Sequence, residues 1–121
     1  YPNSPSGMPG VQTIFPIMID HVNNKKLNLN QLINLMCENP CRIFGINNKG
    51  FIKEGYDADL TIVDMNKEVT IKNEMIASKC GWTPFHNYKV KGFPVGTIIN
   101  GTLVMSDGKI LIESKGKPLS F

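Results

Sequence analysis

Two histidines are the residues of this sequence with the greatest capacity to bind a metal ion or to move a proton. His21 and His86 lie far apart in the chain, and neither belongs to an H-x-H or H-E-x-x-H arrangement, in which two side chains can face one ion. We expect His21 near the end of a helix, where an imidazolium interacts favourably with the helix dipole. The sequence therefore predicts no metal site made by this chain alone.

Three cysteines are the next candidates for chemistry. Cys37 and Cys41 are four residues apart, a spacing that can bring two thiols together, but we interpret them as small buried apolar residues. Cys80 stands beside Gly81 and Trp82 without an activating base, so a nucleophile is not indicated. An odd number of cysteines without a signal-peptide pattern favours reduced thiols and a cytoplasmic protein.

Two carboxylates in the stretch EGYDADL have the spacing of an acid and base pair. Asp57 and Asp59 stand between a glycine turn and the start of a strand, where aspartate commonly accepts hydrogen bonds from backbone N–H groups. We therefore favour a structural role for both. The sequence also has no glycine-rich phosphate loop, and we predict no catalytic residue in the chain.

Composition and charge narrow the class of protein. A chain of 121 residues that is 41% hydrophobic and 19% charged is typical of one folded domain. The net charge of +3 comes from scattered lysines, so the sequence predicts no nucleic-acid partner. The longest apolar run, at positions 14–19, is far shorter than the roughly 20 residues that a membrane-spanning helix needs, so no membrane association is predicted.

The first part of the chain has helical periodicity. Apolar residues spaced by threes and fours predict a helix from Gln12, with Pro16 tolerated in its first turns. A second helix is expected after Asn28 as the N-cap, and Pro40 is expected to end it near residue 39. A short helix would follow at 40–44, ended by Gly45 as a left-handed C-terminal residue. The apolar stripes are formed by Val11, Ile14, Phe15, Met18, Ile19 and Val22, and by Leu29, Leu32, Ile33 and Met36.

The second part alternates like β-structure. Strands are predicted at 59–65 and 68–71 and in the meander at 96–114, with turns at the Asn-Gly and Asp-Gly pairs of positions 100–101 and 107–108. The intervening residues 75–95 contain two glycines and two prolines and are expected to be a long irregular connection.

Three stretches of this sequence resemble class I dihydroorotases, which are cyclic amidohydrolases of the amidohydrolase superfamily. They are SPSGMPGVQT, NPCRIFGINNKGFIKEGYDADLTIVD and SKCGWTPFHNYKVKGFPVGTIINGTLV, in that order. The resemblance covers essentially the whole chain and corresponds to the C-terminal third of such an enzyme. The second stretch is common to hydantoinases, dihydropyrimidinases and allantoinases, whereas the first and third favour a dihydroorotase.

The resemblance implies an α/β parent with a (β/α)8 TIM barrel and a small β-sandwich-like domain. Residues 1–50 would be the last active-site loop and the closing helices of the barrel, and residues 51–121 the C-terminal part of the small β-rich domain. Active-site groups of such barrels come from loops at the C-terminal ends of the strands. The stretch SPSGMPG would be the end of the loop that follows the eighth strand.

The activity implied by the resemblance is the zinc-dependent, reversible hydrolysis of L-dihydroorotate to N-carbamoyl-L-aspartate in pyrimidine biosynthesis. The zinc ligands of the family, which are histidines, a carboxylated lysine and an aspartate, have no counterparts in this sequence. Ser6 and Gly7 match the loop position whose backbone binds the substrate. The missing Cβ of Gly7 would allow close approach of a ligand, although Gly7 and Gly10 could instead serve only to turn the chain into a helix.

Two alternatives stay open at this point. The parent could be a hydantoinase, dihydropyrimidinase or allantoinase instead of a dihydroorotase. The chain could also be a noncatalytic remnant or scaffold that binds a complete dihydroorotase or an aspartate transcarbamoylase. A homo-oligomer is compatible with each of these. Taken alone, the chain is expected to be inactive and to self-associate or fold poorly, because the apolar stripes of its helices and the edges of its sheet would be uncovered.

Overall fold

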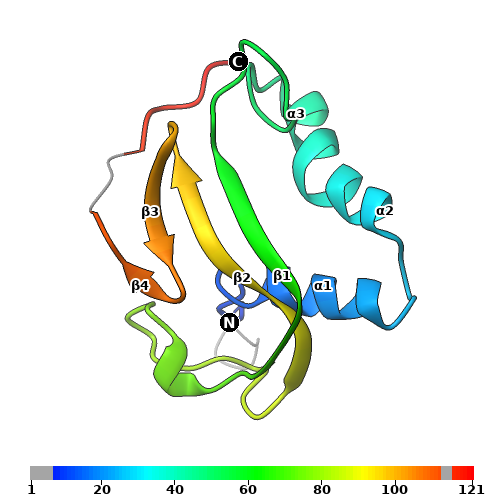
Figure 1. Ribbon diagram of the computed structural model, residues 1–121, viewed down its shortest axis with the longest axis vertical. Helices are drawn as coiled ribbons and strands as arrows, with labels where there is room; N and C mark the ends of the chain where they lie inside the picture. The colour runs from blue at the N-terminus through cyan, green and yellow to red at the C-terminus, as the bar shows by residue number, and fades with distance from the viewer. Residues whose placement is uncertain (1–6, 113–115) are drawn as a thin grey trace, which may run out of the picture.

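The computed structural model describes residues 7–112 and 116–121. Its centre is an antiparallel sheet in the order β1-β2-β3-β4, with β1 at Leu60–Thr70, β2 at Lys89–Ile99, β3 at Thr102–Ser106 and β4 at Lys109–Ile110. Three α-helices precede the sheet in the chain (Figure 1). The predicted order of a helical part followed by a meander is therefore confirmed.

Both predicted turns of the meander are present. Asn100 and Gly101 join β2 to β3 with φ values of 48° and 78°, and Asp107 and Gly108 join β3 to β4 with φ values of 46° and 77°. Two consecutive residues with positive φ give the turn twist that suits a tight antiparallel hairpin, and asparagine, aspartate and glycine tolerate it best. Local chemistry is thus sufficient to define both connections.

Strand β1 is a single bulged strand, where the sequence predicted two. Its pairing with β2 shifts register between Asp64 and Glu68. The Asp64 carboxylate accepts hydrogen bonds from the backbone N–H groups of Asn66 and Lys67, at 2.9 and 3.2 Å, which satisfies donors that the ladder leaves free at the bulge. The polar residues that interrupt the alternation therefore form part of the strand.

Strand β2 begins at Lys89, so the prediction of an irregular connection up to residue 95 is wrong at its C-terminal end. Gly92 and Pro94 usually argue against a central strand. Here Pro94 pairs with Val63 next to a register shift, and Gly92 has a φ of 96° and lies directly against Ile19. Both residues mark irregularities inside the strand and do not end it.

Helix α1 (Ile14–Asn23) packs on β2 with a face that differs from the predicted stripe. It buries Pro16, Ile17, Ile19 and Asp20, while Ile14 stays 52% exposed. The helix starts two residues later than expected, which places Pro16 in its first turn, where a missing N–H costs little. Of the predicted stripe, only Ile19 is fully buried by the described residues.

Polar side chains fasten the end of α1 to the bulged part of the sheet. The buried Asp20 carboxylate accepts a hydrogen bond from the Lys91 N–H at 2.9 Å. The Asn23 amide donates to the carbonyls of Met65 and Lys91, at 2.9 and 2.6 Å. These bonds cross the β1–β2 irregularity and satisfy backbone groups there. The orientation of α1 on the sheet is therefore defined by hydrogen bonds as well as by packing.

The following helical segment continues through Pro40, so the predicted break before this residue is wrong. Helix α2 (Leu29–Ile33) starts with the expected Asn28 cap in a capping box with Gln31. A π-helical stretch, Asn34–Glu38, then leads directly into α3, Asn39–Phe44. The wider π turn absorbs a proline that would otherwise clash with the carbonyl four residues earlier. Gly45 ends α3 with a φ of 63°, as predicted.

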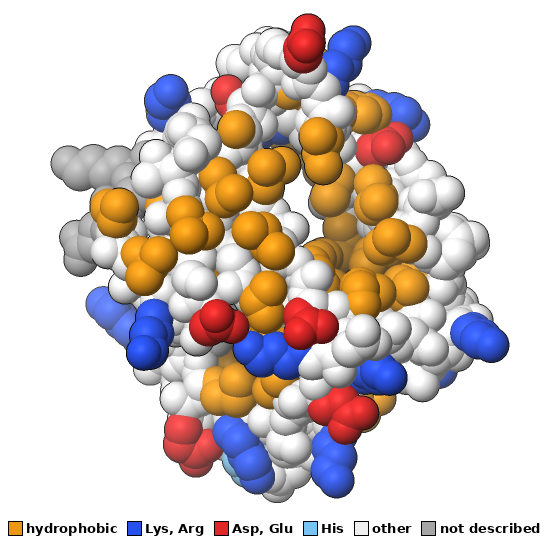
Figure 2. Space-filling model, viewed as in Figure 1, with side chains coloured by type: hydrophobic (Ala, Val, Ile, Leu, Met, Phe, Trp, Pro, Cys, Tyr) orange, Lys and Arg blue, Asp and Glu red, His pale blue; other side chains and the backbone are white. Residues whose placement is uncertain are grey.

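The described residues bury few apolar side chains completely. Ile17, Ile71 and Val90 form the core cluster between α1 and the sheet. Figure 2 shows other apolar side chains along the sheet and along the helices that face it, around a hollow in the surface. Among the described residues, the large apolar side chains with the greatest exposure are Met8, Val11, Ile43, Phe44, Ile52, Ile110 and Phe121. Among the described helices, none has the length and apolar character needed to cross a membrane.

Candidate functional site

The segment before α1, residues 7–13, contains residues 7–10 of the predicted substrate loop, and we call it the Gly7 loop. Gly7 is exposed, whereas Ser6 lies outside the described residues. A Cβ atom added at Gly7 or Gly10 would meet no described atom within 4 Å, and neither glycine has a φ in the left-handed region. The conformation of this part of the chain therefore does not require glycine at either position.

A shallow pocket of about 240 Å³ lies between the Gly7 loop and the segment that follows β1. Its walls are formed by consecutive loop residues on one side and by Ile76 and Ser78 on the other. The Gln12 side chain joins the two walls, because its amide contacts the backbone of Met75 and Ala77. Sequence reasoning missed Gln12, since its partners are more than sixty residues away.

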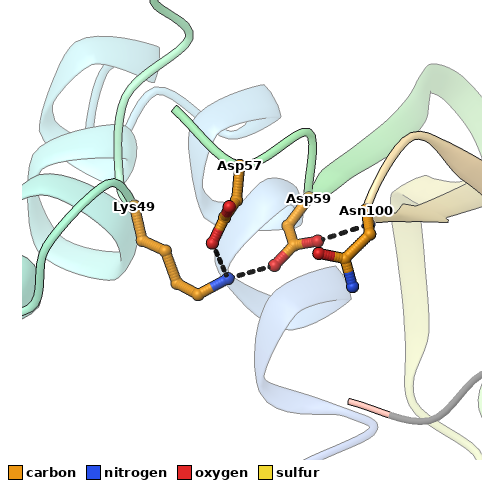
Figure 3. A network of polar contacts seen from close by, with 4 residues as sticks. All are labelled: Lys49, Asp57, Asp59 and Asn100. Atoms are coloured by element: carbon orange, nitrogen blue, oxygen red, sulfur yellow. Dashed lines mark hydrogen bonds and ion pairs between the residues drawn. The ribbon is translucent and has the colours of Figure 1, made fainter. Parts of the chain in front are cut away.

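The predicted carboxylate pair meets a lysine at the opposite end of the sheet. Lys49 Nζ lies 3.0 Å from Asp57 Oδ2 and also contacts Asp59 Oδ2, while Asp59 Oδ1 accepts a hydrogen bond from the Asn100 N–H at 2.8 Å (Figure 3). The loop after α3 is thereby joined to the start of β1 and to the β2–β3 turn. This arrangement supports the predicted structural role, because both carboxylates are already engaged.

The ion pairs shift the pKa values of two members of this group. Hydrogen bonds from Lys49 and from the Asn100 backbone lower the pKa of Asp59. Hydrogen bonds to Asp59 and Asp57 raise the pKa of Lys49. A carboxylate with a lowered pKa and a lysine with a raised pKa are both held in their charged forms at neutral pH. Neither residue is suited to exchange a proton with a substrate at neutral pH.

Replacing Asp59 with asparagine is expected to weaken the β2–β3 turn by about 1 kcal/mol at pH 7. The folded pKa of Asp59 lies below its unfolded value, so its contribution is present above about pH 4 and is lost as the pH falls through the folded value. Amide exchange of Asn100 at pH 7 and pH 2 measures this. Asp57→Asn is the matched control, because Asp57 has the lysine contact without the Asn100 bond. Equal effects of both variants at pH 7 would contradict the prediction.

The histidines do not form a metal site in the described structure. His86 Nδ1 accepts a hydrogen bond from the Asn73 N–H at 3.1 Å. His21 lies in the last turn of α1, as expected, and its Nδ1 has no hydrogen-bond partner among the described residues. Within residues 7–112 and 116–121, no three side chains of His, Cys, Asp or Glu come together as metal ligands would. These residues do not fit the zinc site that the resemblance implies for the parent.

The cysteines are less buried than predicted. Cys37 is exposed and Cys41 is half-buried, so their interpretation as buried apolar residues is wrong for this chain. Gly50 packs against both, since a Cβ there would lie 2.7 Å from Cys41 Sγ and from the Cys37 carbonyl. A hydrogen bond with Ser78 lowers the pKa of the exposed Cys80. The hydrogen-bond partners of Cys80 are the Ser78 hydroxyl and the Trp82 carbonyl, which do not form a catalytic base.

The fold, a short helical segment that precedes an antiparallel sheet, matches part of the structures of two hydantoinases with TM-scores of 0.86 and 0.83. The model of the amidohydrolase family matches residues 10–104. The chain therefore belongs to the amidohydrolase family.

The chain is similar in sequence to two curated relatives and in structure to a solved protein. The chain is 44% identical over 112 residues to a dihydroorotase of Pyrococcus furiosus, covering 93% of the chain and 27% of the relative. It is 36% identical over 110 residues to an L-hydantoinase of Paenarthrobacter aurescens, covering 89% and 24%. The structure of an L-hydantoinase (dihydropyrimidinase) from Arthrobacter aurescens superposes with a TM-score of 0.86 at 35% identity, over 91% of the chain and 25% of that structure.

The chain spans about a quarter of the length of the relatives that it matches. The predicted resemblance to dihydroorotases and the fold class of the amidohydrolase barrels are confirmed. The matched part holds a small antiparallel sheet and the helices that precede it.

Proposed function

We propose that this chain is the part of a dihydroorotase that supplies the end of the substrate loop and the C-terminal part of the small β-rich domain. The reaction would be the reversible hydrolysis of L-dihydroorotate to N-carbamoyl-L-aspartate in cytoplasmic pyrimidine biosynthesis. The observation that carries the proposal is the 44% identity to a dihydroorotase, which extends over 93% of the chain. In this proposal, residues 1–50 close the barrel and residues 51–121 belong to the small domain.

Zinc and its ligands would belong to the remainder of the enzyme. The described histidines are separated and, in the case of His86, already hydrogen-bonded within this chain. The role proposed for the chain is therefore to bind and orient the substrate and to complete the fold around the site, not to carry out the proton transfers. The isolated chain is accordingly proposed to be inactive.

Ser6 and Gly7 are proposed to bind the substrate through their backbone. Support comes from Gly7, which is exposed and has neither a left-handed φ nor a neighbour that excludes a Cβ. The local fold does not explain why this residue is glycine. A ligand contact would explain it, because only glycine lets a ligand approach the backbone from the side of the missing Cβ.

A pair of chimeric enzymes tests the proposed function. In the first, which we call the dihydroorotase chimera, this chain replaces the matching stretch of the Pyrococcus furiosus relative, and in the second it replaces the matching stretch of the L-hydantoinase. The dihydroorotase chimera is expected to hydrolyse dihydroorotate at a rate within about tenfold of that of its parent enzyme. The hydantoinase chimera is expected to lose about 100-fold of the activity of its own parent, because its loops would be misplaced. The opposite ranking would favour the hydantoinase alternative, which the 36% identity supports.

Gly7→Ala supplies the second arm of this experiment. In the dihydroorotase chimera, the added methyl group is expected to raise KM for dihydroorotate by roughly tenfold, because it would occupy the space through which the ligand reaches the backbone. Gly10→Ala is the matched control, since Gly10 is equally open within the chain. An unchanged KM in the Gly7→Ala variant would remove Gly7 from the proposed site. Loss of activity in both chimeras would support the noncatalytic scaffold instead.

A further inference from the structure

The Gln12 side chain makes a two-point contact between segments that are distant in the sequence. Its Nε2 donates to the Met75 carbonyl at 2.6 Å, and its Oε1 accepts from the Ala77 N–H at 2.9 Å. A planar amide that makes two hydrogen bonds in opposite directions holds both position and orientation, as a pair of backbone bonds does in a sheet. Gln12 therefore joins the Gly7 loop to residues 75–77.

The segment around residue 75 is itself held on the sheet, so it provides a stable attachment. Ile71 is buried in the core cluster, and its N–H donates to the Tyr88 carbonyl at 2.8 Å. The side-chain oxygen Oδ1 of Asn73 accepts a hydrogen bond from the Thr83 N–H at 3.0 Å, and the backbone N–H of Asn73 donates to His86 Nδ1. Contacts with the sheet thus fix the position of residues 75–77, and the hydrogen bonds of Gln12 fix the Gly7 loop relative to these residues.

Apart from the buried Thr13, which is the N-cap residue of α1, the Gly7 loop has few other attachments among the described residues. Its backbone bonds run from Thr13 and Ile14 to the Gly10 carbonyl, at 3.0 and 2.8 Å, and tie the loop only to the start of α1. Val11, next to Gln12, is 98% exposed and contributes little packing. The pocket between the loop and Ile76 separates the two walls except where Gln12 spans them.

We propose that Gln12 is a positioning residue for substrate binding: it sets the distance between the Gly7 loop and residues 75–77 and so orients the backbone at Gly7. The inference rests on the proposed function, because it assigns to Gln12 the alignment of that same site. The role requires no contact between Gln12 and the substrate. Loss of the Gln12 side chain would leave the Gly7 loop attached only at α1, so the loop would adopt a wider range of positions.

Kinetics of the dihydroorotase chimera, which contains the chain intact, test this role. Gln12→Ala is expected to raise KM for dihydroorotate about tenfold with little change in kcat, because binding is lost without a change in the reacting groups. The isosteric Gln12→Glu keeps the size of the side chain but loses the donor to Met75, so it is expected to raise KM as well. Gln31→Ala is the matched control: it removes the capping box of α2, away from the loop, and is expected to leave KM unchanged.

Amide exchange of Ala77 in the same proteins separates this inference from the proposed function. Gln12→Ala is expected to increase the exchange rate of the Ala77 amide several-fold, whether or not the chimera is active, whereas Gln12→Glu keeps the oxygen that accepts from this amide and is expected to change its exchange rate less. Unchanged exchange in the Gln12→Ala variant would overturn the contact itself. Faster exchange in this variant with an unchanged KM in an active chimera would overturn the positioning role. Faster exchange in this variant of a chimera that is itself inactive would overturn the proposed function and leave the contact in place.

Discussion

The isolated 121-residue chain is expected to self-associate at micromolar concentration. Several of its large apolar side chains are poorly covered: Val11 is 98% exposed and Ile52 is 92% exposed, and Ile43 and Phe44 of α3 are also exposed. Exposed apolar surface favours association in water, since each Å² that association buries contributes about 25 cal/mol. In a complete barrel enzyme, the remainder of the protein would cover these side chains.

Sedimentation velocity over a range of concentrations measures this association. Replacing Ile43 and Phe44 together with serine is expected to reduce it, because both lie exposed at the end of α3. Ile17→Ser is an informative contrast, since Ile17 belongs to the core cluster and its loss is expected to unfold the chain and increase association. A stable monomer with a cooperative thermal transition would contradict the prediction.

Gly92→Ala is expected to have the largest effect of any single small substitution in the sheet. The added Cβ would overlap with the Ile19 side chain of α1 and would also have to adopt a φ of 96°. The backbone cost of about 1–2 kcal/mol and an overpacking cost of similar size combine to about 3 kcal/mol. In the dihydroorotase chimera, amide exchange of β2 is therefore expected to become roughly 100-fold faster.

Gly55→Ala separates the two components of this effect. Gly55 has a similar φ of 82°, but a Cβ there would meet no described atom within 4 Å. The control is thus expected to cost only the backbone component of about 1 kcal/mol, which is about a fivefold change in exchange. Equal effects at both positions would mean that the contact between α1 and β2 is loose enough to admit a methyl group.

Much of the local structure could be predicted because its causes lie within a few residues. Asn28 caps α2 through a neighbour three positions away, and Gly45 ends α3 because it accepts a left-handed φ. The two hairpin turns follow from Asn-Gly and Asp-Gly in the same way. For the candidate site, the sequence pointed to the Gly7 loop and to structural roles for Asp57 and Asp59.

The errors occur where a distant partner changes the outcome of a local preference. Gly92 and Pro94 read as loop residues, yet both lie in β2, because Gly92 makes room for Ile19 and Pro94 occupies a register shift. No pattern in the sequence around Gly92 and Pro94 contains the information about these partners. The error at Pro40 has a local cause instead: this proline usually ends a helix, yet the π turn before it lets the helix continue.

By itself, the sequence of this protein determined the family, the order of helices and strands, and the turns, since these depend on side-chain periodicity and on hydrogen bonds between near neighbours. Only the tertiary structure decided which face of α1 is buried, because that face is selected by Gly92 and Lys91 of β2. It also decided that Gln12 meets Met75 and not solvent. A side chain's partners across such separations depend on how complete elements pack, which is a property of the whole fold.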